Sequence, residues 1–184
     1  LKVQNEESRT AMSEKFDVIV IGAGAAGLMC AAEAGKRGRR VLVVDHAKKP
    51  GRKILISGGG RCNFTNYDVS ANNFLCKNPH FVKSALSQYT NWDFISMVSK
   101  YGIEFEERDH GQLFCVNDHT AKDIVSMLLE ECQQAKVEQR YRCDVHSIEK
   151  TDSGFKMQLN TDQVECDSLV GATGGLSMPQ PGTK

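Results

Sequence analysis

The feature that most constrains the fold is a glycine-rich segment, Gly22-Ala-Gly-Ala-Ala-Gly27, between an apolar run and an alanine-rich stretch. The apolar run, Val18 to Ile21, is typical of a buried strand, and the residues after Gly27 favour a helix. In this strand–turn–helix context a GxGxxG pattern indicates a dinucleotide-binding βαβ unit. The alternative is a loop that needs glycine only for positive φ. We predict that the N–H groups at the start of the helix face phosphates.

Each glycine of the pattern has its own expected role. Gly22 permits the tight turn, Gly24 lets a pyrophosphate approach the backbone, and Gly27 lets helix and strand pack closely. Val41-Leu-Val-Val44 supplies a second strand, and Asp45 follows it. An acid at the end of this strand can accept hydrogen bonds from both hydroxyls of an adenosine ribose. The sequence therefore predicts a nucleotide site at these strand ends.

A second glycine-rich segment lies between Gly51 and Asn66, in a connection far longer than usual, and such connections are usually functional. Between Lys36 and Arg61 there are nine Lys and Arg residues and one acid, Asp45. This basic stretch is interpreted in two ways, as a solvated helix end with a loop and as an attraction for a phosphate-rich ligand. Some of these nine basic residues fit the first interpretation and others fit the second.

Composition excludes several classes of protein. The 23 Lys and Arg residues balance 23 Asp and Glu residues, so net charge indicates no particular partner. The seven cysteines contain no C-x-x-C pair and the five histidines form no cluster, so we predict neither a metal site nor a redox dithiol. Free cysteines fit a reducing cytoplasm. The longest nearly uncharged run, residues 16–32, is too short and too glycine-rich to span a bilayer, so we predict no membrane segment.

The rest of the chain predicts short helices and strands. Residues 81–89 and 91–101 have apolar side chains at helical spacing, and their aromatic residues are interpreted as core. Residues 103–105 and 112–116 indicate a hairpin. Thr120-Ala-Lys-Asp123 is a capping box that opens a further helix. An antiparallel meander is then predicted from four short strands, and a buried strand follows at 169–171; the meander strands are 137–141, 145–149, 155–159 and 164–166.

These elements predict an α/β fold, a Rossmann-like domain with a mainly parallel sheet and a small antiparallel meander. Residues 1–15 are polar and without periodicity, so they are expected to be a disordered or non-native extension. The domain is predicted to occupy residues 16–184.

The order of elements resembles the two-dinucleotide-binding flavoprotein fold, whose second FAD fingerprint is similar to Ala172-Thr-Gly-Gly175. Lys53-Ile-Leu-Ile-Ser-Gly-Gly-Gly-Arg-Cys-Asn63 resembles the signature of a bacterial family of FAD-dependent oxidoreductases, the BaiN/RdsA type. Residues 78–94 and 111–115 strengthen the match, which runs from Phe16 to Pro179 and points to the gammaproteobacterial branch.

The resemblance implies a flavoprotein that binds FAD and takes electrons from NAD(P)H. Its implied substrate is unsaturated, either a uridine of large-subunit ribosomal RNA or a small molecule such as a bile-acid intermediate. It also implies cofactor contacts: the pyrophosphate at Gly22, Gly24, Ala25 and Ala26, the ribose at Asp45, and the adenine at the backbone of Val145. Further contacts between pyrophosphate and flavin are implied for Lys53, Ser57, Gly58, Gly59, Arg61, Cys62, Asn63, Thr173 and Gly174. No residue is predicted to be a catalytic acid or base.

The sequence departs from the family pattern in two respects. Asp45 stands where many FAD enzymes carry Glu, which leaves NAD open as the nucleotide at this site. Family members also continue well beyond the Ala-Thr-Gly-Gly segment, so we expect the chain to be a C-terminally truncated FAD-binding part without its substrate domain.

Two alternatives follow from these departures and from the basic stretch. One is a truncated nucleotide-binding fragment that binds FAD weakly and has no activity. The other, an RNA-binding module, is permitted by the basic stretch. It is disfavoured because the sequence has no aromatic-basic RNA motif and because the aromatic residues on helical faces fit a core better.

Overall fold

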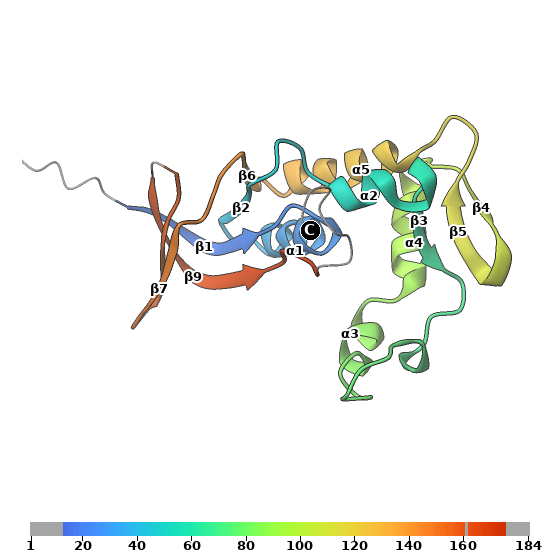
Figure 1. Cartoon of the computed structure of the whole chain (residues 1–184), viewed down its shortest axis with the longest axis horizontal. Helices are drawn as coiled ribbons and strands as arrows, with labels where there is room; N and C mark the ends of the chain where they lie inside the picture. The colour runs from blue at the N-terminus through green and yellow to red at the C-terminus, as the bar shows by residue number, and fades with distance from the viewer. Residues whose placement is uncertain (1–12, 161, 176–184) are drawn as a thin grey trace, which may run out of the picture.

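The computed structural model describes residues 13–160 and 162–175 and contains a six-stranded sheet in the order β6-β2-β1-β9-β8-β7 (Figure 1). The first four strands of this order are mutually parallel, and the last two are antiparallel to their neighbours. The strands are β1 (Glu14–Ile21), β2 (Val41–Asp45), β6 (Glu138–Tyr141), β7 (Ser147–Thr151), β8 (Gly154–Gln158) and β9 (Gln163–Gly171).

Strand β2 is buried on both faces, which is why its sequence is a continuous apolar run. On one face, Val20 and Val43 belong to a cluster with helices α1 (Ala25–Lys36) and α5 (Ala121–Gln134). On the other face, Ile19 and Leu42 belong to a cluster that includes Met157 of β8. The central strands are therefore held between two apolar layers.

A second, three-stranded sheet has the order β3-β5-β4 and packs against a helix. The ring of Phe64 in β3 lies 6.1 Å from that of Phe94 and 5.4 Å from that of Phe105. The remaining elements are α2 (Arg52–Ile56), η1 (Ser57–Gly60), β3 (Asn63–Asn66), η2 (Ala71–Asn73), α3 (Lys83–Gln88), α4 (Asn91–Lys100), β4 (Phe105–Glu107), η3 (Asp109–Gly111) and β5 (Gln112–Cys115).

Locally determined predictions are confirmed. The hairpin is β4 and β5, which pair in antiparallel register. The capping box at Thr120 is present, with its side chain accepting from the Lys122 N–H at 3.2 Å and Asp123 closing the motif. Helix α4 begins at Asn91 and buries Ile95 and Val98.

Two predictions about strands are wrong. Residues 137–141 do not start the meander, because β6 pairs in parallel with β2 at the edge of the sheet. Residues 164–166 and 169–171 are not separate strands, since β9 continues through both and pairs with β1 along seven residues. The long connection from 45 to 66 contains α2, η1 and β3. Local alternation reports that a segment is extended and gives no information on its partner strand.

The interpretation of the helical aromatics as core is half correct. Phe94 and Tyr101 pack against the larger cluster, whereas Phe81 is 75% exposed and Trp92 is 55% exposed. Helical spacing indicates an apolar face and does not show what covers it. The exposed rings lie on or beside residues 67–90, which we call the arm.

Strand β1 begins at Glu14, before the predicted domain start at residue 16. Residues 1–12 and 176–184, which include most of the predicted extension and the end of the family resemblance, lie outside the described residues. Among the helices that the structure describes, none is long and apolar enough to cross a membrane. The same residues contain no cluster of three His, Cys, Asp or Glu that could hold a metal ion.

Candidate nucleotide-binding site

The first glycine segment forms the turn between β1 and α1. Gly24 is the N-cap residue of α1 and has an extended backbone, φ −87° and ψ −172°. No side chain among the described residues caps this helix, so the N–H groups of its first turn lack a capping partner. Ala25 and Ala26 are exposed in that turn. The start of α1 thus presents backbone donors and the positive end of the helix dipole.

The glycines of this turn have different surroundings. A Cβ placed on Gly24 meets no described atom within 4 Å. A Cβ on Gly27 would overlap the carbonyl oxygen of Gly22, far closer than the 3.0 Å that real Cβ contacts respect. Gly27 is therefore required for packing, while Gly24 leaves open space in front of the helix. This space fits the pyrophosphate that the sequence predicts there.

Four segments meet at this turn. The Gly22 N–H donates to the Val44 carbonyl at 2.8 Å, and the Ala172 N–H donates to the Ile21 carbonyl at 2.8 Å. The Gly51 N–H donates to the Ala23 carbonyl, also at 2.8 Å. The carboxyl ends of β1, β2 and β9 and the start of α2 therefore share one edge of the sheet. Ligands of open α/β sheets bind at this edge.

Lys53 and the segment after β9 add a basic group to this edge. The Lys53 Nζ donates to the Gly175 carbonyl at 2.7 Å and lies near Gly174. Thr173 follows Ala172, and its N atom lies 3.1 Å from the position of a Cβ on Gly22. The structure thus brings Lys53, Thr173 and Gly174 to the first glycine turn, although they are distant in sequence.

Asp45 makes a contact that the sequence did not reveal. One carboxylate oxygen accepts the Ala23 N–H at 2.7 Å, and the other accepts the Ala47 N–H at 2.8 Å. The carboxylate is 15% exposed and lies 3.5 Å from the His46 Nδ1. Asp45 therefore fixes the glycine turn to the end of β2. A carboxylate has about four acceptor positions, so acceptors for ribose hydroxyls are left.

Val145, the predicted adenine contact, follows β6 at the same edge. Its segment is tied to β2 because the Cys143 N–H donates to the Asp45 carbonyl at 3.0 Å. The Val145 side chain packs against the cluster that contains Leu42. Its backbone N–H and C=O make no hydrogen bond to another described residue. Both groups are thus available to a ligand beside Asp45.

The second glycine segment is built on β5. The Ser57 Oγ donates to the Ile54 carbonyl at 2.8 Å, and a Cβ on Gly58 would lie 2.6 Å from the Phe114 ring. The Arg61 carbonyl accepts the Cys115 N–H at 2.9 Å. Arg61 and Asn63 are exposed, and Gly59 has open space around it. These predicted residues form one continuous turn, which connects through α2 to the first glycine turn.

Cys62 lies in this turn with φ 52° and is buried. Burial raises the pKa of its thiol, and a hydrogen bond with Ser57 opposes this in part. Because Asn63 pairs with Phe114 in antiparallel register, Cys62 lies beside Cys115. Burial raises the pKa of Cys115 to about 11. This neighbour could not be predicted, since the two cysteines are far apart in the chain.

These pKa shifts predict slow thiol chemistry at Cys62. A raised pKa lowers the thiolate fraction at neutral pH, and the thiolate is the reacting species. With iodoacetamide at pH 7.5, we expect exposed Cys76 to be alkylated at least ten times faster than buried Cys62 and Cys115. Peptide mass spectrometry over time measures the three rates. Equal rates for Cys62 and Cys76 would show that Cys62 is accessible and activated.

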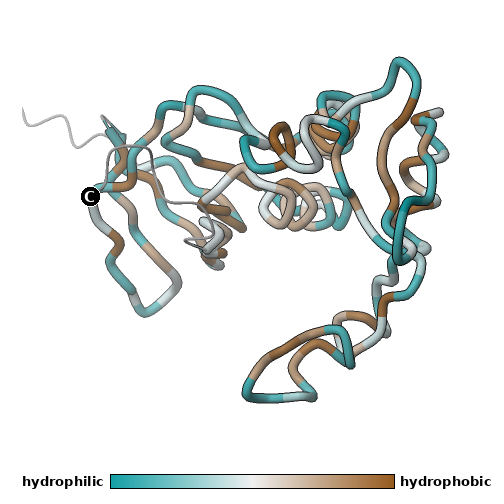
Figure 2. Tube along the Cα trace, turned by 45° about the vertical axis from the view of Figure 1, so that its right-hand side comes forward, coloured by the Kyte–Doolittle hydropathy of each residue, from teal (hydrophilic) through white to brown (hydrophobic). Residues whose placement is uncertain are grey.

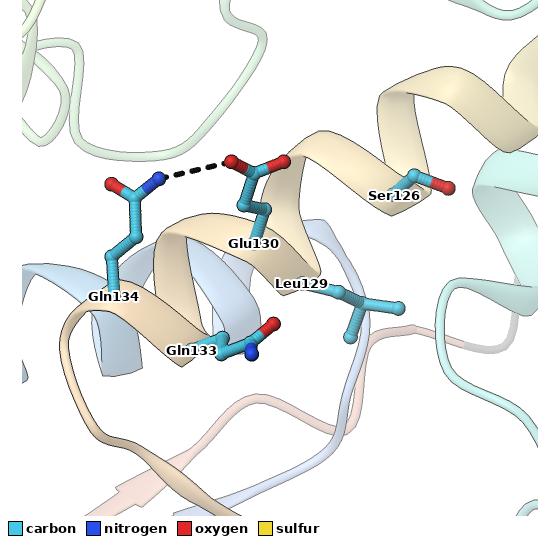
Figure 3. Close-up of a pocket in the computed structure, with 5 residues that line it drawn as sticks. All are labelled: Ser126, Leu129, Glu130, Gln133 and Gln134. Carbon is cyan, nitrogen blue, oxygen red and sulfur yellow. Dashed lines mark hydrogen bonds between the residues drawn. The ribbon is translucent and has the colours of Figure 1, made fainter.

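A shallow hollow lies on the surface of α5 (Figure 3). Its wall carries one internal hydrogen bond, from the Gln134 Nε2 to the Glu130 Oε1 at 3.0 Å. The lining residues are Ser126, Leu129, Glu130, Gln133 and Gln134, and none is a predicted nucleotide contact. We assign no role to this hollow.

Comparison with known proteins decides the family. The Rossmann-domain profile of HI0933-like proteins matches residues 16–184. The chain belongs to the HI0933-like family. The predicted resemblance to BaiN/RdsA-type oxidoreductases and the Rossmann-like fold are thereby confirmed.

Two relatives illustrate the range of the HI0933-like family. The ribosomal RNA dihydrouridine synthase of Escherichia coli (strain K12) is 57% identical over 166 residues, which are 90% of this chain and 41% of that protein. The 3-dehydro-bile acid delta(4,6)-reductase of Clostridium scindens is 25% identical over 166 residues, 89% of this chain and 40% of that protein. The chain thus spans about two fifths of the length of these relatives.

Solved structures show the same fold. The 3-ketosteroid-delta4-(5alpha)-dehydrogenase of Rhodococcus jostii RHA1 aligns with a TM-score of 0.63 and 16% identity, over 95% of this chain and 49% of that protein. At this identity the likeness concerns the architecture of the HI0933-like domain alone.

Proposed function

We propose that this chain forms the FAD-binding part of an oxidoreductase that reduces a uridine of large-subunit ribosomal RNA to dihydrouridine, with NAD(P)H as electron donor in the cytoplasm. The observation that carries the proposal is the open space at Gly24, between the uncapped start of α1 and the Asp45 carboxylate. The 57% identity to the Escherichia coli dihydrouridine synthase supports the choice of substrate.

Bound FAD would supply the hydride-transfer chemistry. In this proposal the N–H groups of Ala25 and Ala26 hold the pyrophosphate, and the ammonium of Lys53 adds positive charge beside it. Asp45 accepts the ribose hydroxyls, and the Val145 backbone contacts the adenine. The turn from Ser57 to Asn63 extends towards the flavin.

A second candidate is a nucleotide-binding unit that has no turnover by itself. The partial coverage of the relatives supports this for the chain alone, so we assign catalysis only to a polypeptide of the relatives' length. A flavin enzyme acting on a small unsaturated molecule is the further alternative, supported by the relative from Clostridium scindens.

Three measurements test the proposal. Titration of the purified chain with FAD, followed by flavin fluorescence, tests cofactor binding. With a polypeptide of the relatives' length that carries these residues, NADH and NADPH oxidation tests the donor. A ribosomal RNA fragment is then analysed by mass spectrometry for uridine that has gained two hydrogens. FAD-dependent gain of two hydrogens supports the proposal, and NADPH oxidation with a bile-acid substrate alone favours the small-molecule alternative.

Replacing Asp45 with Asn is expected to weaken FAD binding roughly tenfold or more. The variant keeps the shape but loses one charged acceptor, and a hydrogen bond to a charged group contributes about 1.5–3 kcal/mol. Isothermal titration of FAD measures the loss, and Asp45→Glu, which keeps the charge on a longer side chain, is measured for comparison.

The ribose contact of Asp45 can be separated from its bond to the glycine turn. If Asp45 accepts the ribose hydroxyls, the parent chain binds ADP more tightly than 2′-deoxy-ADP, and the Asn variant loses this preference. Equal discrimination by both proteins would show that Asp45 only fixes the Ala23 N–H.

A further inference from the structure

The arm, residues 67–90, projects away from both sheets and ends in α3 (Figure 1). None of its residues, all of which the structure describes, is buried. Its apolar stretches alternate with hydrophilic ones along the tube (Figure 2). Leu75 is 99% exposed, and the Phe74 ring is also exposed. The arm therefore presents apolar groups to solvent without forming a core of its own.

The base of the arm is fixed to the second sheet and to α4. The Asn91 Nδ2 donates to the carbonyls of Asn66 at 2.9 Å and Tyr67 at 3.0 Å. The Tyr67 N–H donates to the Gly111 carbonyl at 2.9 Å. A capping box at Thr90 begins α4 directly after the arm. Both ends of the projection are thus anchored by hydrogen bonds.

Acidic residues lie only at the two ends of the arm, at Asp68 and at Asp93 just beyond it. Between Val69 and Trp92 the sequence has no Asp or Glu, although 23 of the 184 residues of the chain are acidic, one in eight. The same segment contains Lys77, His80 and Lys83. All three side chains lie on exposed residues. A surface that binds a protein can contain Asp and Glu. A surface that binds a nucleic acid disfavours them, because each carboxylate would repel the phosphates of the ligand.

Aromatic rings are spread along the same segment. Trp92 stacks on Tyr67 with 5.3 Å between ring centroids and an angle of 25° between ring planes. Phe74 and Phe81 offer further exposed rings. Proteins that bind unpaired RNA combine such rings, on which bases stack, with Lys and Arg side chains that contact the RNA backbone. The exposure of Phe81 and Trp92 shows that these two rings are not core residues, which was one of the reasons for which the sequence disfavoured RNA binding.

We propose that the arm is a binding surface for single-stranded RNA. Unpaired bases stack on Phe74, Phe81 and the Tyr67–Trp92 pair, and Lys77 and Lys83 contact phosphates. The choice of RNA as the ligand rests on the proposed function. The arm would give the RNA substrate a binding surface away from the nucleotide site.

Trp92 provides a direct probe, because it is the single tryptophan of the chain. We expect a single-stranded, uridine-rich oligonucleotide of twelve nucleotides to quench its fluorescence saturably at low salt. Affinity should fall as salt increases, since phosphate contacts release counterions. A duplex of the same length should bind more weakly, because its bases are already stacked.

Two variants and one control assign the binding to the arm. Phe81→Ala removes an exposed ring and should weaken RNA binding about fivefold or more. Lys83→Ala should weaken binding and reduce its salt dependence. Ile148→Ala, at a 49% exposed apolar residue of β7, should leave RNA affinity unchanged. Circular dichroism shows whether each variant keeps its fold.

Unchanged RNA affinity in folded Phe81→Ala and Lys83→Ala would overturn the proposal. It would also be wrong if Phe81→Ala left RNA binding intact and instead converted an oligomer to a monomer in analytical ultracentrifugation, because the arm would then be a protein interface. RNA binding is measured without FAD. A chain that binds RNA through the arm but does not bind FAD would therefore contradict the proposed function and support the arm.

Discussion

Replacement of Gly24 by valine is expected to abolish FAD binding while the domain stays folded. The extended backbone of Gly24 suits any residue, and a Cβ there meets no described atom within 4 Å. The valine side chain would instead fill the space in front of the first N–H groups of α1. Loss of two hydrogen bonds to a charged pyrophosphate, at about 1.5–3 kcal/mol each, weakens binding by roughly 100-fold or more.

The measurement is a flavin-fluorescence titration of parent and variant, with circular dichroism as the check on folding. Gly24→Ala provides a graded comparison, because its methyl group fills less of the same space. Phe81→Ala is the control for a substitution outside the site. FAD affinity equal to that of the parent in a folded Gly24→Val protein would refute the assignment of this turn to the pyrophosphate.

The parts of the site that the sequence predicts are those set by neighbouring residues. The β1–α1 turn follows from glycine spacing between an apolar run and an alanine-rich run, and Asp45 follows from the end of β2. The capping box at Thr120 is equally local. In each case a few residues determine the backbone, because the hydrogen bonds involved span only a few positions.

The parts that the sequence misses depend on distant segments. The pairing of β6 with β2, the position of Cys115 beside Cys62 and the bond from the Ala23 N–H to Asp45 all join residues that are far apart in the chain. The exposure of Phe81 also depends on which distant segments pack against this part of the chain. A helical repeat of apolar residues looks the same whether a partner covers it or not, so burial cannot be inferred from spacing alone.

Asp45 has two possible roles, a contact with the ribose and a hydrogen bond to the glycine turn. The rule places an acid after β2 because the ribose lies there. In the structure the same carboxylate also accepts the N–H of Ala23, inside the glycine turn. The shorter side chain of Asp, compared with Glu, keeps both oxygens close to the backbone. In the proposed site, stability of the turn and recognition of the ribose are therefore coupled at this position.

Substitution of Gly27 by alanine is expected to lower the stability of the domain in the absence of any ligand. Substitution of Gly24 is instead expected to lower FAD affinity while the domain stays folded. The methyl group added at Gly27 would overlap the Gly22 carbonyl oxygen and lie 3.4 Å from the Ala172 Cβ. Relief requires α1 to move away from β1, and overpacking of this kind costs about 1–3 kcal/mol and occasionally more. For a domain of this size the melting temperature should fall by roughly 2–12 °C.

Gly24→Ala is the matched control for this prediction, since it adds the same methyl group three residues earlier in the same turn. Thermal unfolding is followed by circular dichroism without FAD, so that ligand binding does not stabilise one protein over another. We expect the Gly24→Ala protein to melt close to the parent and the Gly27→Ala protein to melt well below it. If both variants melt together, the close approach of α1 to β1 at Gly27 contributes nothing to stability. A lower melting temperature for the Gly27→Ala protein alone would assign the packing of α1 against β1 to Gly27 and not to Gly24.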